Sequence, residues 1–211
     1  YNGHVLLFLV TLRMHFSGEA LIENNALGIL LLIILMGVFI YITYSKKSEI
    51  MSALVLGMLT TIAIISNVIP VMLGMLVFIS VFSVYFLNKF GWHVQFFLSI
   101  FLVYFTFILW FFNNPIVTGE VRAVETLHLS YVYLIACAMM YSITAILPLK
   151  NKLSEGKVNA SVIINGLGFS LLLLLINVNF FKDNFYITTG IVFFISIGFS
   201  IILQARKGLS I

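Results

Sequence analysis

The chain has 211 residues, of which 62% are hydrophobic and 9% are charged, and its formal net charge is +4. A soluble domain carries about a quarter charged residues and needs a polar shell around its core. The composition therefore excludes a water-soluble globular protein and makes lipid the expected solvent. Runs such as residues 30–35 are apolar on every face, which favours helices over alternating barrel strands. The predicted fold class is an all-α, polytopic transmembrane helical bundle.

The predicted spans follow one another through one domain, residues 1–211. A helical crossing takes about 20 apolar residues, so residues 1–12 are expected to be a partial span of a longer protein. Residues 66–70 break a neutral run that is too long for one crossing, because proline suits a first helical turn. Residues 113–115, Asn-Asn-Pro, predict a turn. Seven full spans are expected near residues 26–44, 50–66, 68–87, 94–112, 129–149, 158–180 and 185–203.

The charges on the connectors predict an orientation. Eight of the eleven basic residues fall on one side of the predicted bundle, whereas most acidic residues fall on the other. Cytoplasmic loops carry the excess of Lys and Arg, so the eight-base side is expected to be cytoplasmic, with the C-terminus there, in a bacterial inner membrane. No nucleic-acid partner is expected. The eight residues are Lys46, Lys47, Lys89, Lys150, Lys152, Lys157, Arg206 and Lys207.

Two further features lie near this side. Tyr41, Tyr44, Tyr85 and Trp92 fall near the predicted cytoplasmic ends, where aromatic residues typically anchor a span. An aromatic cage for a cation would need a clustering that the sequence does not show. Several lysines could also attract anionic lipid head groups, although orientation alone explains them. These lysines are Lys46, Lys47, Lys150, Lys152 and Lys157.

The predicted outer connectors hold a group of charged and titratable residues. Carboxylates, histidine and arginine together can bind a cation or polarise a substrate. Residues 121–127 could form a short amphipathic turn on the membrane or a plain exposed loop. No metal signature such as HExxH is present, so solvated loop charges are the favoured interpretation and no metal or cofactor is predicted. The outer-face candidates are Arg13, His15, Glu19, Glu23, Glu120, Arg122, Glu125 and His128.

Polar residues inside the predicted spans are all uncharged. Ion-coupled transporters usually place an Asp, Glu, Lys or Arg within the bilayer, and none lies there in this sequence. Hydroxyl and amide groups more often hydrogen-bond between helices or to their own backbone. Asn165 is the most informative, because a buried amide must find partners. Gly166 and Ser170 also have the spacing of a close helix-packing face. The intramembrane candidates are Ser80, Ser83, Asn165 and Ser170.

A few short marks resemble a known family. They are Arg-Met-His-Phe at residues 13–16, a leucine-rich span ending in lysines, Asn-Asn-Pro at residues 113–115 after a tryptophan-tipped span, and Ile-Ile-Asn-Gly-Leu-Gly-Phe at residues 163–169. Together they resemble the large predicted membrane proteins of a bacterial domain-of-unknown-function family. The resemblance implies a very long chain of many consecutive spans, and it transfers no catalytic residue.

Three functions are open on these grounds, in order of preference. The first is a scaffold-type segment or subunit of a larger membrane protein or complex, with the bilayer and further transmembrane segments as partners. The second is a transporter or channel for a neutral or lipid-like solute, which predicts a shared polar path through the intramembrane candidates. The third is a membrane enzyme that acts on a lipid-linked substrate at the outer face. A non-enzymatic role is favoured.

Overall fold

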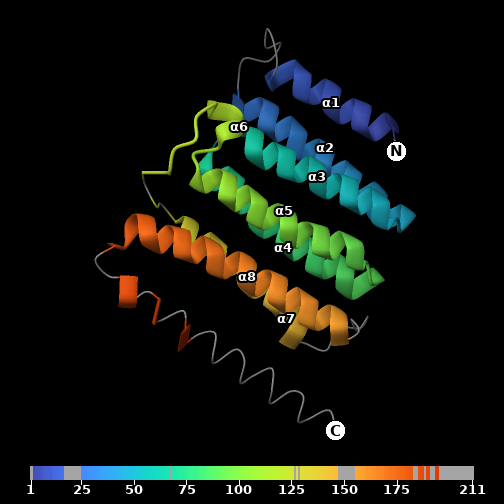
Figure 1. Cartoon of the computed structure of the whole chain (residues 1–211). Helices are drawn as coiled ribbons and strands as arrows, with labels where there is room; N and C mark the ends of the chain where they lie inside the picture. Colours follow the sequence, from blue (N-terminus) through green and yellow to red (C-terminus); the bar gives the residue numbers. More distant parts are fainter. Residues whose placement is uncertain are drawn as a thin grey trace.

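The computed structural model describes residues 2–16, 25–66, 68–125, 127, 129–146, 155–182, 185–187, 189–190 and 193–194. Within these ranges the ordered elements are helices, and no strand occurs. Figure 1 shows the longer helices lying side by side, with α1 at one edge of the bundle. The helices are α1 (Asn2–Phe16), α2 (Asn25–Lys46), α3 (Glu49–Ser66), α4 (Ile69–Phe90), α5 (His93–Phe111), α6 (Pro115–Thr118), α7 (Ser130–Ile146) and α8 (Glu155–Phe180).

Five of these helices, α2, α3, α4, α5 and α8, are long and apolar enough to cross a membrane. Apolar helices of this length are typical of a helical membrane protein. Two further helices, α1 and α7, are apolar but shorter. Seven full spans were predicted, and five helices among the described residues are long and apolar enough to be such spans. The predicted span 129–149 is represented by the 17-residue α7, and most of the predicted span 185–203 lies outside the described residues.

Helix ends lie where local chemistry favours them. Pro70 stands in the first turn of α4, as predicted, where its missing N–H costs no hydrogen bond. Gly91 ends α4 with φ 74°, and its N–H donates to the carbonyl of Leu87. The predicted Asn-Asn-Pro turn is confirmed: Asn113 and Asn114 have φ values of 58° and 50°, a left-handed conformation that asparagine tolerates better than most residues.

The helices pack in two layers. One layer contains α3, α5 and α8, and the other contains α2, α4 and α7, with α1 packed on α2. Extensive contacts cross between the layers, and α4 also packs on α7. By contrast, α2 and α4 both pack on α3 but scarcely touch each other. The core between the layers includes fully buried Leu56, Leu76, Phe96 and Leu134.

The two ends of the bundle differ in charge. Lys46, Lys89 and Lys157 lie near the ends of α2 and α4 and the start of α8, and we call this end of the bundle the basic end. It includes the start of α5, where the N–H of Val94 donates to Oε1 of Glu49 at the start of α3. At the opposite end lie the α3–α4 turn, the α5–α6 turn and the loop before α7 (Figure 1).

Candidate functional site

The outer-face candidates do not form a cluster among the described residues. Arg13 was expected in a connector, but α1 continues to Phe16, so Arg13 lies within a helix, where it is exposed. His15 also lies in α1, and its side chain is not among those described. Glu120 is exposed. Glu19, Glu23 and His128 lie outside the described residues.

Arg122 and Glu125 are the two candidates that do meet. Their side chains form an ion pair while remaining 69% and 70% exposed. An exposed pair of this kind contributes about 0–1 kcal/mol to stability. Among the described residues, no three His, Cys, Asp or Glu side chains are placed to hold a metal ion. The arrangement is that of solvated loop charges.

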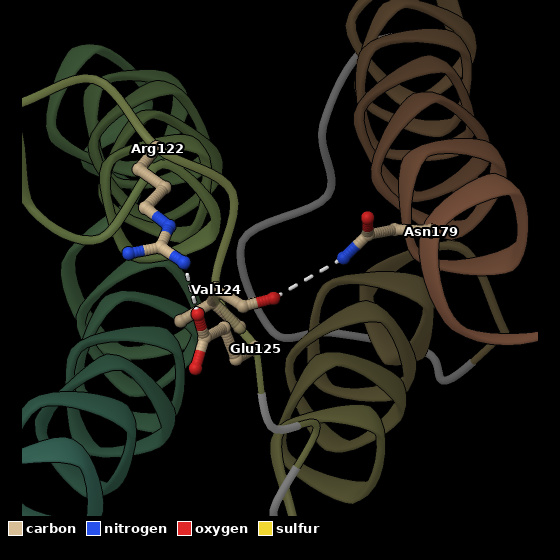
Figure 2. A network of polar contacts seen from close by, with 4 residues as sticks. All are labelled: Arg122, Val124, Glu125 and Asn179. Atoms are coloured by element: carbon tan, nitrogen blue, oxygen red, sulfur yellow. Dashed lines mark hydrogen bonds and ion pairs between the residues drawn. The ribbon is translucent and has the colours of Figure 1, made fainter.

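The loop that carries this pair is held from both sides. Its backbone at residues 120–125 is not helical, so the described part matches the exposed-loop alternative rather than an amphipathic turn. The N–H of Val124 donates to the carbonyl of Phe111 at 2.9 Å. The carbonyl of Val124 accepts from Nδ2 of Asn179 at 3.2 Å, while the Arg122–Glu125 pair lies to one side of that bond (Figure 2). The loop therefore links α5 to α8.

Asn165 joins three helices in the bundle interior. Its Oδ1 accepts from the hydroxyl of Tyr104 on α5 at 2.6 Å. Its Nδ2 donates to the carbonyl of Ala138 and to Oγ of Ser142 on α7, each at 3.1 Å. Asn165 is 5% exposed and Tyr104 is 6% exposed. Both donors and one acceptor position of the amide are used within the protein, as expected for an interhelical hydrogen-bonding residue.

A close backbone approach accompanies this junction. A Cβ placed on Gly168 would lie 2.6 Å from Cδ2 of Tyr104, so only glycine lets α8 approach the ring this closely. Gly166 and Ser170, predicted as a packing face for this bundle or for a further part of the protein, are both exposed on α8 and so make no close approach among the described residues. Gly168, two residues from each of them, makes the close approach instead.

The serine candidates on α4 have other partners. Oγ of Ser83 accepts from Nε2 of Gln95 on α5 at 3.0 Å, and Oγ of Ser80 donates to the carbonyl of Val77 at 2.7 Å. On α5, Oγ of Ser99 accepts from the hydroxyl of Tyr141 at 3.2 Å. Ser83 thus bonds to α5, Ser80 bonds within α4 and to Cys137 of α7, and Asn165 bonds to α5 and α7. The exposed Ser170 joins none of these contacts.

Gln95 and Tyr104 were not predicted as site residues from the sequence. Gln95 is the single amide in the predicted span 94–112, and that polarity could have marked it. It is fully buried, and among the described residues its Oε1 has no hydrogen-bond partner. Tyr104 carries no comparable signal, since tyrosine is also common as a packing residue in spans. Only the folded contact with Asn165 identifies it.

At the basic end, Glu49 caps a helix other than its own. Its Oε1 accepts from the N–H groups of Val94 and Gln95 at 2.8 and 3.2 Å. These are orphan donors of the first turn of α5, and Trp92 at the N-cap supplies no side-chain cap. A carboxylate at this position also complements the helix dipole. Glu49 therefore fixes the start of α5 against the start of α3.

Lys89 is surrounded by aromatic residues at the same end. Its Nζ donates to the hydroxyls of Tyr44 and, at 3.2 Å, Tyr85, and it lies 4.1 Å from the centre of the Tyr44 ring. The rings of Phe86 and Trp92 stack nearby with centroids 5.0 Å apart. Two of the predicted aromatic anchors, Tyr44 and Tyr85, thus contact the Lys89 ammonium, and their rings and hydroxyls stabilise its charge.

No protein-family model, curated protein or solved structure matches the chain. The resemblance to the family of large bacterial membrane proteins therefore stays a prediction.

Proposed function

We propose that the chain is a scaffold-type segment of a larger membrane protein or complex, which holds neighbouring spans in fixed positions. The observation that supports this most is the use of buried polar groups. Asn165 and Ser83 bond to side chains of neighbouring helices rather than facing a common cavity. A transport path needs polar groups that remain available to a solute. Helix-to-helix bonding instead favours a fixed bundle.

The outer surface of α8 supports the proposed partners. Ile163, Leu167, Leu171, Leu174 and Val178 are each at least 50% exposed. Their spacing places them along one side of the helix. A surface of this kind suits lipid or a further transmembrane helix. A longer chain with many consecutive spans, as in the resembled bacterial family, would supply such helices.

The proposed setting is a bacterial inner membrane with the basic end in the cytoplasm. The uneven distribution of lysines supports this orientation. The acidic Glu120 and Glu125 lie on the loop at the opposite end.

Purification with crosslinking tests the scaffold proposal. A photo-reactive amino acid at Leu167, 67% exposed on α8, is expected to capture another transmembrane segment or subunit when irradiated in the native membrane. The matched control carries the same group at Val121, 77% exposed on the loop. Mild detergent extraction and mass spectrometry should then recover a defined assembly or a much longer chain. Recovery of a stable, isolated monomer without crosslinks would overturn the proposal.

A further inference from the structure

An apolar groove lies between α2 and α4. These two helices flank α3 and scarcely touch each other, and the space between them has a volume of about 400 Å³. Ile33, Gly37 and Ile40 line it from α2, Gly74 and Phe78 line it from α4, and Leu59 of α3 also lines it. At its rim, Ile33 and Phe78 are 42% and 46% exposed, so the groove opens sideways.

Two glycines keep this groove open. A Cβ placed on Gly37 or Gly74 would meet no atom of another helix within 4 Å among the described residues. The lining side chains are all apolar, so water would find no hydrogen-bond partners there. The groove lies within helices apolar enough to cross a membrane. Hydrocarbon is therefore its natural occupant.

The same two helix faces lead to a cation. On α2, Tyr44 follows Ile40 by one turn, and on α4, exposed Val81, Tyr85 and Lys89 continue the side that begins at Phe78. Lys89 has three donor hydrogens, and the two tyrosine hydroxyls accept two of them. Among the described residues the one ion pair is formed elsewhere, so Lys89 has no anionic partner there. It can donate its third hydrogen to an anion.

The length of this path fits a lipid tail. From Tyr44 to Ile33 the helix rises by about 16 Å, at about 1.5 Å per residue. Half of a bilayer's hydrocarbon core is about 15 Å thick. Along α4, Phe78 at the near end of the groove lies about 16 Å from Lys89, and Pro70 at its far end lies about 28 Å away. A tail whose head group lies beside Lys89 would therefore reach Ile33 and Phe78 near the middle of the membrane, and the part of the groove beside Pro70 lies beyond it.

We propose that the groove and Lys89 together bind one anionic phospholipid, with an acyl chain between Gly37 and Gly74 and a phosphate oxygen accepting a hydrogen bond from Nζ of Lys89. Lys46 and Lys47 at the end of α2 add positive charge near the head group. Lipid binding at this site does not require that the bundle act as a scaffold, so this proposal is independent of the proposed function.

Native mass spectrometry of the purified full-length protein tests the site. The protein is released from detergent in the presence of phosphatidylglycerol or phosphatidylcholine with identical acyl chains, and retained lipid is counted. Wild type should retain phosphatidylglycerol preferentially. Lys89→Gln should reduce that preference about five-fold, since one lysine near a membrane surface contributes on this scale. Gly37→Leu and Gly74→Leu should reduce retention of both lipids by filling the groove.

Matched controls separate these effects from general damage. Gly166→Leu places the same side chain on an exposed site of α8 with no neighbour within 4 Å, and Lys157→Gln removes an exposed lysine at the same end. Both should behave as wild type. The proposal is overturned if Lys89→Gln keeps the preference, if both leucine variants in the groove retain lipid normally, or if the controls lose lipid equally. Should one leucine variant unfold, the other, on a different helix, decides the outcome.

Discussion

The hydroxyl of Tyr104 on α5 donates a 2.6 Å hydrogen bond to Oδ1 of Asn165 on α8. Sixty-one positions separate the two residues in the chain. Asn165 also donates to α7, so one amide sets the rotation of three helices relative to each other. The contribution of this contact to the stability of the bundle can be measured, and that measurement tests the proposed scaffold role directly.

Removing the hydroxyl of Tyr104 should destabilise the bundle, because Asn165 would lose a hydrogen-bond donor. Tyr104→Phe leaves a buried carbonyl oxygen without that donor, and interhelical bonds in membranes average about 0.6 kcal/mol with a maximum near 1.7. A double-mutant cycle with Asn165→Leu, measured by thermal unfolding in detergent, should give a coupling of about this size. Tyr41→Phe, at a position 71% exposed, is the control. Strictly additive losses would show that the two side chains do not stabilise each other.

Gly168→Ala should lower the melting temperature, although alanine is the better helix former. The added Cβ would lie 2.6 Å from the Tyr104 ring, near its attachment point, where the ring cannot easily move away. Gly166→Ala meets no neighbour and should be neutral or stabilising by up to about 1 kcal/mol. The two variants carry the same chemical change two residues apart. Equal effects on melting temperature would contradict the close approach of α8 to Tyr104.

The positions of the helices could be predicted from the sequence, because hydrocarbon forces every backbone hydrogen bond into local helices. The chain breaks at Pro70 and at Asn113 and Asn114 followed directly from residue chemistry. Membrane anchoring was likewise readable from the uncharged spans. These features depend on neighbours in the chain.

The pairing of the helices could not be predicted. A soluble helix reveals its inner face by its polar outer face, but here both faces are apolar. In α8, Leu171 is exposed while Leu172 and Leu173 are buried, and nothing in that leucine run distinguishes them. The rotation of each helix, and with it the contact between Tyr104 and Asn165, is fixed only by packing. The groove between α2 and α4 was hidden for the same reason.

Glu49→Gln should destabilise the basic end of the bundle. The carboxylate accepts two N–H groups from the first turn of α5, and loss of a helix cap typically costs about 0.5–2 kcal/mol. Gln keeps a carbonyl oxygen but loses the charge that complements the helix dipole, so Glu49→Ala should cost more than Glu49→Gln. Hydrogen exchange of amides at residues 94–97 is the direct readout. Glu120→Gln on the exposed loop should leave the exchange of these amides unchanged. If Glu120→Gln accelerated it as much as Glu49→Gln does, Glu49 would not be a specific cap of α5.

The proposed orientation predicts which end of the bundle reacts with an impermeant reagent. In a Cys137→Ala background, cysteine is placed at Val121, in the loop at one end, or at Lys157, at the basic end. Both sites are exposed on the protein, so membrane sidedness alone should control their labelling. With the basic end in the cytoplasm, a membrane-impermeant maleimide added to intact bacterial cells should label Val121→Cys. It should label Lys157→Cys only after the membrane is permeabilised. The reverse pattern would place the lysines outside and remove the reason to assign the C-terminus to the cytoplasm.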